Sequence, residues 1–247
     1  MKLEDVLSSI LSIPDIDLCL KNAHRRCIPI YLVGGTLRDI FLGLKLKDID
    51  LVVETSAERF LEYIENLGIK GRLLKRFYTF KFKVGSNDIE HIDIAIARKE
   101  VYPRPGALPI VEPGTIEEDL YRRDFTINAL AVPIYPKKKP GEILDPLGGI
   151  KDLEDRTIRV LHDRSFIDDP TRIFRAVRFS VRLGFVIEPH TYELMEDAIK
   201  GGALRTVGIA RIRKEIELCE KEEKNKEIFQ VLKALGILTR EFIEPGS

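Results

Sequence analysis

The hydrophobic pattern changes character near residue 150 of this 247-residue chain. Before that point, short apolar segments rich in β-branched residues alternate with helix-like segments, and Gly, Pro, Asn or Lys bound each of them. After it, apolar residues recur at helical spacing. The pattern predicts an α+β fold, with a mixed five-stranded sheet in residues 1–150 and an all-helical domain in residues 151–247. The predicted strands are Ile28–Val33, Ile49–Val53, Thr79–Val84, Ile89–Ala97 and Asn128–Ile134.

Helices are predicted where apolar residues stand three or four positions apart. In Ser56–Asn66, the residues Phe60, Tyr63 and Ile64 share one face, and Ser56 has a side chain suited to an N-cap. This helix should pack on one face of the sheet. In the second half, helical spacing predicts Asp169–Leu183, Pro189–Ala198, Gly208–Lys221 and Asn225–Leu235.

Two aspartates at one strand are the first candidates for chemistry. If Ile49–Val53 is a strand, its period of two puts Asp48 and Asp50 on one side and Ile49 and Leu51 on the other. Two carboxylates on one side can hold a divalent cation, and magnesium usually combines such carboxylates with the phosphates of a substrate. A nucleoside triphosphate with magnesium is therefore the expected occupant.

A glycine pair precedes these aspartates and points to phosphate binding. Gly34 and Gly35 follow a predicted buried strand and precede a helix-like segment that carries Arg38. The pattern is not a dinucleotide-binding fingerprint, because Thr36 and Asp39 stand where its second and third glycines would fall. A Gly-Gly turn is common, and an aspartate pair often just ends a solvated strand. Their combination in one strand-turn-helix-strand unit is much more specific.

Composition and charge exclude few classes of protein. Forty basic and forty acidic residues give zero formal net charge, so affinity for RNA must come from local clusters of Lys and Arg. No apolar stretch approaches the roughly 20 residues that span a bilayer, and the N-terminus lacks the layout of a signal peptide, which predicts a cytoplasmic protein. Cys19, Cys27 and Cys219 include no CxxC pair, so we expect reduced thiols and no zinc site.

Five motifs, in order along the chain, resemble those of one enzyme family. The segment YLVGGTLRDIFLGLKLKDIDLVVE (31–54) resembles the first motif of class II tRNA nucleotidyltransferases, the CCA-adding enzymes, and of the related bacterial poly(A) polymerases. RRDFTINALAV, from Arg122, resembles the second motif, and LDPLGGIKDLEDRTIRVL, from Leu144, the third. DDPTRIFRAVRF, from Asp168, resembles the nucleotide-selecting motif, and RIRKEIE, from Arg211, its supporting helix.

The resemblance implies a polymerase-β-like nucleotidyltransferase head followed by a helical neck, and a reaction. An RNA 3′-hydroxyl would attack the α-phosphorus of CTP or ATP and release pyrophosphate. Two Mg²⁺ ions would suit this step, one between Asp48 and Asp50 at the attacking hydroxyl and the other at the triphosphate and leaving pyrophosphate. We expect a third carboxylate on a neighbouring strand, and Asp93 is the candidate because the isoleucines around it would face the opposite, buried side. The residues expected to bind the nucleotide here are Gly34, Gly35, Arg38, Arg123 and Asn128, the last through the ribose.

The nucleotide-selecting motif implies a protein template for the base. The resemblance implies that Asp169 and Arg172 form hydrogen bonds with the Watson-Crick edge of cytosine or adenine. It also implies that Arg175 and Arg178 lie on the phosphates of the nucleotide or nearby. Asp169 precedes Pro170 at the expected helix start, so it could instead serve as an N-cap. Arginines every three residues also occur on ordinary amphipathic helices. The family usually has glutamate where this chain has Asp168.

The expected function is addition of CMP, AMP or both to the 3′ acceptor end of tRNA, which leaves CCA, CC-only and A-only products open. A poly(A) polymerase is the alternative. An RNA-binding module without catalysis is the rival of another class, and the intact Asp48, Asp50, Arg38 and Arg172 argue against it. We expect the proline-rich segment Tyr102–Gly114 to form neither strand nor helix, to lie beside the active site and to decide the product.

Two further expectations concern surfaces. Lys137–Lys139, between two prolines, is predicted to be a solvated hairpin tip rather than an RNA clamp. Members of the family that are longer grip tRNA with additional helical regions, and this chain has little room for them. Two alternatives stay open: the chain is a fragment, or a partner subunit or second copy supplies that grip. In the second case, exposed apolar residues near Leu232, Ile237 and Phe242 would form the interface.

Overall fold

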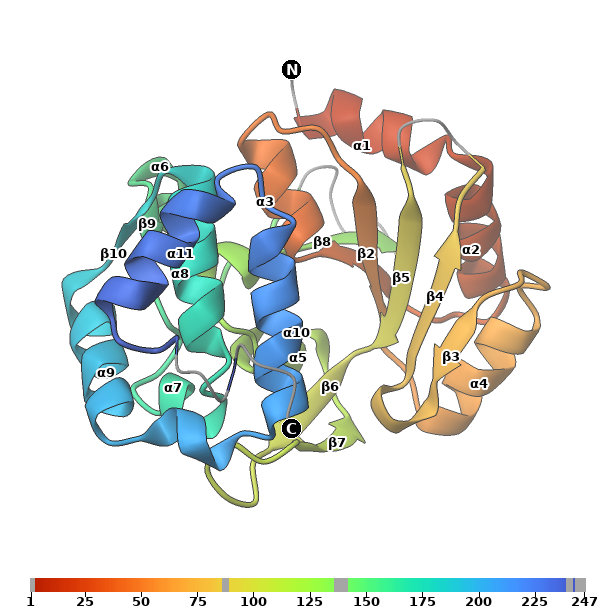
Figure 1. The fold of residues 1–247 in the computed structure, drawn as a ribbon. Coiled ribbons are helices and arrows are strands. Elements are labelled where there is room, and N and C mark those ends of the chain that lie inside the picture. The colour runs from red at the N-terminus through yellow and green to blue at the C-terminus, as the bar shows by residue number, and fades with distance from the viewer. Residues whose placement is uncertain (1–2, 86–88, 136–141, 239–241, 243–247) are drawn as a thin grey trace. The chain divides into compact units, whose positions relative to one another are not determined.

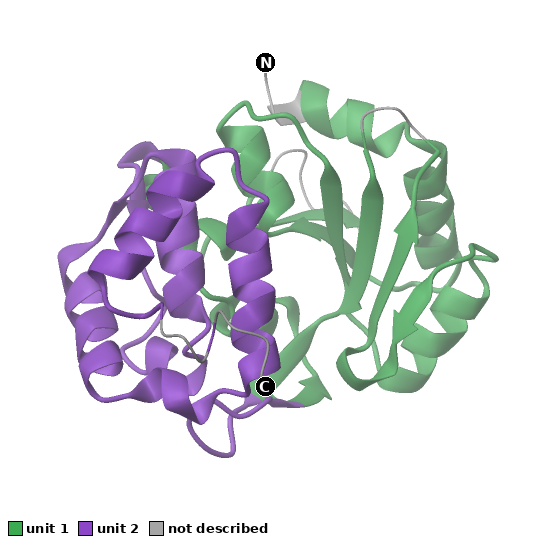
Figure 2. Cartoon of the chain, viewed as in Figure 1, with its two compact units in different colours: residues 1–100, 111–153 green, residues 101–110, 154–247 purple. Residues whose placement is uncertain are grey.

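The computed structural model describes residues 3–85, 89–135, 142–238 and 242. They form two compact units, which Figure 2 shows in two colours: unit 1 contains residues 1–100 and 111–153, and unit 2 contains residues 101–110 and 154–247. Residues 101–110, which precede the change in hydrophobic pattern, thus group with unit 2. The hairpin tip predicted at Lys137–Lys139 lies outside the described residues.

The centre of unit 1 is a mixed six-stranded sheet with the strand order β3-β4-β5-β2-β1-β8 (Figure 1). Strands β2 and β5 are parallel, and the other neighbours are antiparallel. The mixed sheet is as predicted, but it has a sixth strand, β3, whose three residues are too few to show an alternating pattern. The strands are β1 (Ile30–Val33), β2 (Asp48–Val53), β3 (Arg72–Leu74), β4 (Thr79–Lys83), β5 (His91–Ile96) and β8 (Ala131–Tyr135).

Strand β8 begins three residues later than predicted. Asn128 ends a short 3₁₀ helix, Thr126–Asn128, and the strand starts at Ala131. The Asn128 side chain accepts a hydrogen bond from Arg38 and donates one to Asp124, so it is bound among side chains before the ladder begins. The predicted start was wrong because an amide in a polar network does not alter hydrophobic periodicity.

The helices of unit 1 include the predicted one. Helix α4 follows Ser56, whose hydroxyl accepts a hydrogen bond from the Arg59 amide as an N-cap does. Buried Tyr63 joins α4 to α2 through its hydroxyl, which donates to the Cys19 carbonyl at 3.0 Å. In Figure 1 both helices lie to the same side of strands β4 and β5. The helices are α1 (Leu3–Leu11), α2 (Pro14–Arg25), α3 (Gly35–Phe41), α4 (Ala57–Glu65), α5 (Ile116–Tyr121) and α6 (Gly149–Glu154).

The proline-rich segment contains a strand that the sequence did not predict. β6 (Arg98–Val101) and β7 (Ile110–Pro113) form a separate two-stranded sheet, so the expectation that Tyr102–Gly114 contains no strand was wrong. Pro113 is the last residue of β7, a position where its missing N–H costs little. The remainder of the segment has neither strand nor helix, as expected.

Unit 2 is mainly helical, with α8 packed against α10 and α11. The four predicted helices are present, although α8 starts at Arg172 rather than Asp169. The unit is not all-helical, because β9 (Thr157–Ile158) and β10 (Val186–Ile187) form a short parallel pair. The helices are α7 (Ser165–Asp168), α8 (Arg172–Leu183), α9 (Pro189–Lys200), α10 (Ile209–Glu220) and α11 (Asn225–Ala234).

The three apolar residues expected to be exposed at the C-terminal end are buried. Leu232, Ile237 and Phe242 are 0%, 2% and 7% exposed, so the predicted interface at these residues was wrong. Leu232 lies in α11, which packs on α8, and helical spacing alone does not say which apolar face of a short helix is covered. Among the described residues, no helix has the length and hydropathy needed to cross a membrane.

Candidate active site

Three carboxylates lie on the same face of two adjacent strands of unit 1. Asp48 and Asp50 alternate along β2 with the buried Ile49, as the period of two predicted. Asp93 stands directly beside Asp50 in the parallel register of β2 and β5, so the two side chains extend from the same face. Lys81 of β4 is the next residue across, and its ammonium forms an ion pair with Asp93.

The buried Asp50 carboxyl has a raised pKa. Burial is the main cause that raises the pKa of Asp50 to about 6; the positive charge of Arg123 acts in the opposite direction, and the neighbouring Asp93 adds to the effect of burial. The backbone N–H of Asp50 donates to the Thr36 hydroxyl at 2.8 Å, which ties the carboxylate's strand to α3. A carboxylate with a raised pKa has less positive charge around it than its ionised form needs.

The donor set fits a hard divalent cation that brings ligands of its own. Within the described ranges, no group of three or more His, Cys, Asp or Glu side chains is arranged to hold a metal ion. Asp48 and Asp50 offer two carboxylates, and Asp48 is 62% exposed at its side chain. A cation of the magnesium type commonly binds through one or two carboxylates and takes the rest of its ligands from water and phosphate.

The two glycines provide space for two guanidinium groups. Gly34 has φ +64° and ψ −131°, a conformation that side-chain-bearing residues avoid. A Cβ atom there would lie 2.5 Å from Nη1 of Arg123, and a Cβ atom at Gly35 would lie 3.4 Å from Nη2 of Arg38. Both positions also lie near the Asp50 carboxylate. The glycine pair therefore brings two cationic side chains next to the carboxylates.

Arg38 is buried and held by two partners. Its Nη1 donates to the Asn128 side-chain oxygen at 2.7 Å, and its Nε donates to Asp39 at 2.8 Å. The Asn128 amide in turn donates to Asp124 at 3.0 Å. The structure therefore brings Arg38 and Asn128 together, although 90 positions separate them in the chain.

Arg123 is held by Asp119, a buried carboxylate that the sequence did not lead us to predict as part of the site. Nε and Nη2 of Arg123 donate to Oδ2 of Asp119, at 3.2 and 2.8 Å, and Nη1 donates to the Asn128 carbonyl at 3.1 Å. Burial alone would raise the pKa of Asp119, but Arg122 and Arg123 hold it below its usual value. The available signal was the spacing, because Asp119 on the capped helix α5 precedes Arg123, just beyond the end of that helix, by four residues.

In unit 2, one oxygen of Asp169 accepts three hydrogen bonds. Oδ1 accepts from the backbone N–H and hydroxyl of Thr171, at 3.1 and 2.6 Å, and from Nη2 of Arg211 at 2.7 Å. Oδ2 has no hydrogen-bond donor among the described residues. Asp169 is not the N-cap of α8, because that residue is Thr171. The free oxygen leaves Asp169 able to accept from a ligand.

Arg211 also fixes the segment 101–110 within unit 2. Its Nη1 donates to the Gly106 carbonyl at 2.9 Å, while the Gly106 amide donates to the Ile167 carbonyl at 3.3 Å. Gly106 has φ +67°, and a Cβ atom there would collide with Thr206. One guanidinium thus contacts both Asp169 and the segment expected to decide the product.

The three arginines of the nucleotide-selecting motif, all on α8, differ in their surroundings. Arg172 is buried, and its Nη1 donates to the Ser165 hydroxyl at 2.6 Å. Arg178 is also buried and pairs with Glu222 at 3.0 Å, while its Nε is a buried atom without a hydrogen-bond partner. Arg175 is less buried and lies over the Phe179 ring, 5.3 Å from its centroid. Arg178 is therefore directed toward Glu222 in this structure.

The third motif has a local structural explanation. Both oxygens of Asp145 accept hydrogen bonds from the first turn of α6, from the amides of Gly149 at 2.6 Å and Ile150 at 3.0 Å. Side-chain acceptors at a helix start satisfy amides that have no partner inside the helix. This motif therefore stabilises the end of unit 1.

Comparison with known proteins was made at the level of family, sequence and structure. Residues 30–159 match the family described as the poly A polymerase head domain, which is more than half of the chain. An A-adding tRNA nucleotidyltransferase of Aquifex aeolicus is 42% identical over 215 residues, which are 87% of this chain and 26% of that protein. A CC-adding tRNA nucleotidyltransferase of Deinococcus radiodurans is 36% identical over 190 residues, which are 73% of this chain and 48% of that protein.

A solved structure of a CCA-adding enzyme, in its apo form II, superposes with a TM-score of 0.77 at 41% sequence identity. The match covers 89% of this chain and 51% of that one. This chain thus spans about a quarter to a half of the length of these similar proteins. The shared part includes every motif singled out from the sequence up to residue 159.

Proposed function

We propose that this chain, which belongs to the family of class II tRNA nucleotidyltransferases and bacterial poly(A) polymerases, transfers AMP from ATP to the 3′ end of tRNA and releases pyrophosphate. The observation that carries the proposal is the cluster in unit 1: Asp48 and Asp50 on β2, next to a glycine pair flanked by Arg38 and Arg123. Carboxylates for a cation and guanidinium groups for phosphate together suit a nucleoside triphosphate.

Enzymes of this family generally use divalent metal ions. We propose Mg²⁺ for this chain, held by Asp48 and Asp50. An ion held there would lower the pKa of the attacking hydroxyl, and a second ion on the triphosphate would offset the charge that develops on the leaving pyrophosphate. The raised pKa of Asp50, due to burial, supports a cation here, because added positive charge stabilises the ionised carboxylate. Asp93 is proposed as the third carboxylate, since its register places it beside Asp50.

The triphosphate would be held by the glycine pair and two arginines. Gly34 and Gly35 allow the close approach of backbone to phosphate, and Arg38 and Arg123 carry forked, permanently charged groups. Arg38 and Arg123 have fixed partners inside unit 1, so little side-chain freedom is lost when phosphate binds. Asn128 lies between them and is proposed to contact the ribose.

Unit 2 would select the base. We propose that the free Oδ2 of Asp169 accepts from the amino group of adenine, while Arg172 donates to a ring or carbonyl acceptor. Uracil and guanine present the wrong pattern at those positions and would leave the polar groups unpaired. Arg175 and Arg178 are proposed near the phosphates. For Arg178 this requires its guanidinium to leave Glu222.

AMP is proposed rather than CMP because the A-adding relative has the higher identity of the two compared, 42% against 36%. The description of the matching family as a poly A polymerase head domain favours a second candidate, a poly(A) polymerase. The two differ in whether addition stops after one nucleotide.

A homo-oligomer or partner subunit that helps to grip tRNA stays a prediction, and light scattering after size exclusion tests it. A cytoplasmic location also stays a prediction.

The deciding experiment is primer extension with three tRNA transcripts that end before CCA, after C and after CC. Each is offered CTP, ATP or both, with Mg²⁺. One AMP added only to the CC-ended transcript, followed by arrest, is the expected result. Addition of C, C and A, or of C alone, would correct the product while preserving the class of reaction. Long A tails on any RNA would establish the polymerase, and no addition to any transcript would contradict the proposal.

A further inference from the structure

We propose that Asp119 is the positioning residue that fixes Arg123 for the triphosphate, an inference that rests on the proposed function. Asp119 lies in α5 with 0% exposure, so it does not itself meet a ligand from solvent. A buried carboxylate is costly unless charges and hydrogen bonds compensate it. The groups that offset the cost of burying the Asp119 carboxylate therefore indicate its role.

Each oxygen of Asp119 is used by a different arginine. Oδ1 accepts from Nε and Nη2 of Arg122, at 3.0 and 2.6 Å, and Oδ2 accepts from the corresponding atoms of Arg123, at 3.2 and 2.8 Å. Two N–H groups of one guanidinium on one oxygen define the position and orientation of its plane. Asp119 therefore sets the orientation of both planes at once.

The two arginines are not equally dependent on Asp119. Arg122 has a second carboxylate partner, Glu100, at 3.1 Å. Among the described residues, Asp119 is the one carboxylate that pairs with Arg123. Arg123 is also the arginine whose Nη1 approaches the Gly34 turn. Loss of the Asp119 charge should therefore release Arg123 more than Arg122.

Arg123 keeps donors for a ligand after these contacts. A guanidinium carries five N–H groups, and Arg123 uses three of them on Asp119 and the Asn128 carbonyl. The remaining two belong to Nη1 and Nη2, and Nη1 lies at the glycine turn. Asp119 thus occupies one edge of the fork and leaves donors for phosphate on the other.

The test compares Asp119→Asn with wild type in binding and kinetics. Asparagine keeps the size of the side chain but removes its charge, and its NH₂ group cannot accept. We expect the Kd for ATP and for inorganic tripolyphosphate to rise about tenfold, the strength of one charge-assisted hydrogen bond. The preference for ATP over CTP should stay unchanged, and KM should rise more than kcat falls.

A double-mutant cycle with Arg123→Lys separates positioning from general weakening. If Asp119 acts through Arg123, the double variant should bind ATP no more weakly than Arg123→Lys alone. If the losses of ATP affinity in the two single variants multiply in the double variant, the proposal is wrong. Glu100→Gln removes the second partner of Arg122 and should lower thermal stability while leaving the Kd for ATP within twofold. Equal weakening by Glu100→Gln and Asp119→Asn would also overturn it.

Glu117→Gln is the matched control, because it removes a carboxylate from the exposed side of the same helix and should leave the Kd for ATP unchanged. If Asp119→Asn does not fold, Asp119→Glu keeps the charge but displaces the fork, and we expect about threefold weaker ATP binding. Wild-type Kd values for Asp119→Glu would then contradict the proposal. If the protein does not extend any tRNA but its ATP binding still depends on Asp119, the proposed function is wrong and the positioning role of Asp119 is retained.

Discussion

Units 1 and 2 hold their candidate ligand-binding groups in opposite ways. In unit 1, Arg123 is fixed by a buried carboxylate, Asp119, that does not itself meet the ligand. In unit 2, the carboxylate proposed to meet the ligand is itself fixed by an arginine, because Arg211 binds Oδ1 of Asp169 and Oδ2 stays available. At Arg123, unit 1 therefore presents an oriented positive charge, and at Asp169, unit 2 presents an oriented acceptor.

The difference separates affinity from selectivity. Charge on a triphosphate is the same for all four nucleotides, so changes in unit 1 should weaken all of them alike. An oriented acceptor distinguishes bases by their donor pattern, so changes in unit 2 should alter the ratio between nucleotides. The predictions below test this division, beginning with the largest expected effect.

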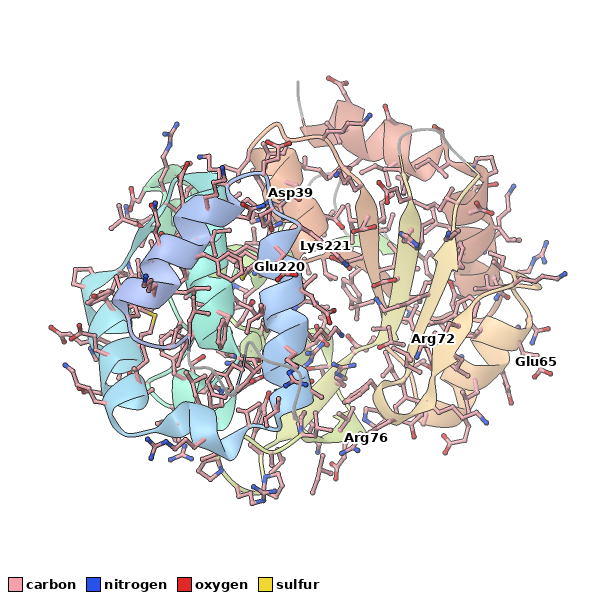
Figure 3. The ribbon with its side chains drawn as sticks, in the orientation of Figure 1. Asp39, Glu65, Arg72, Arg76, Glu220 and Lys221 are labelled. Atoms are coloured by element: carbon pink, nitrogen blue, oxygen red, sulfur yellow. The ribbon has the colours of Figure 1, made fainter. Side chains whose placement is uncertain are left out.

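Removal of the two β2 carboxylates should abolish activity for every nucleotide. The double variant Asp48→Asn/Asp50→Asn keeps the shape of both side chains but removes the charges that hold the cation, and we expect incorporation to fall at least about 1000-fold with ATP and CTP alike. The measurement is primer extension under single-turnover conditions. Glu65→Gln is the control, because Glu65 is exposed at the end of α4 and points away from the strands (Figure 3). Unchanged activity of the double variant would remove the catalytic assignment.

Asp50 should also make stability depend on pH when metal is chelated. Burial raises the pKa of Asp50 from 3.8 to about 6, so the folded state binds this proton more tightly than the unfolded state. The contribution to stability is complete below about pH 4 and is lost as the pH rises through about 6. We expect a loss on the order of 2 kcal/mol in the free energy of unfolding.

Denaturant titrations between pH 4 and pH 7 in EDTA measure this loss. Asp50→Asn should show a smaller fall than wild type, while Glu65→Gln should match wild type. If the curves of Asp50→Asn and wild type are parallel over the whole range, Asp50 does not have the raised pKa.

Replacement of Arg211 by lysine should change the selectivity among nucleotides that we assign to unit 2. In Arg211→Lys, one ammonium cannot reach both Asp169 and the Gly106 carbonyl as the fork does. We expect the preference for ATP over GTP, measured as the ratio of kcat/KM values, to fall about tenfold because Asp169 loses its fixed orientation. Arg205→Lys makes the same substitution at an exposed residue of unit 2 and should preserve the ratio. An equal loss with every nucleotide would break the division proposed above.

Much of unit 1 was predictable because its chemistry coincides with periodicity. Asp48 and Asp50 stand at alternate positions of a strand, and Asp93 follows the same pattern on β5, so their shared face could be inferred from spacing. Asp119 was missed because its role depends on a contact with Arg123. The spacing of these two residues is the same as in many surface ion pairs, so the sequence does not distinguish them.

Prediction failed where tertiary contacts decide the outcome. Burial of Leu232, Ile237 and Phe242 depends on which neighbour covers them, and no pattern within one helix contains that information. The strand β7 arises because β6 is available to pair with it, which overrides the poor strand propensity of a proline-rich segment. The three hydrogen bonds to one oxygen of Asp169 likewise join residues up to 42 positions apart.

The smallest expected effect isolates the space that Gly34 provides for Arg123. Gly34 and Gly43 have nearly the same φ, +64° and +65°, but a Cβ atom at Gly43 meets nothing within 4 Å, whereas one at Gly34 meets Nη1 of Arg123 at 2.5 Å. Alanine at either position should cost about 1 kcal/mol of stability, because both backbones are strained for a residue with a side chain.

Only Gly34→Ala should also displace the guanidinium of Arg123, which can move at little cost because it ends a flexible side chain. We expect Gly34→Ala to raise the Kd for ATP and CTP equally, by about fivefold, and Gly43→Ala to leave both unchanged. Thermal melting and nucleotide titration of the two variants give the comparison. Equal nucleotide affinities in the two variants would mean that the space beside Gly34 serves the backbone alone, and that the position of Arg123 is not what unit 1 contributes to affinity.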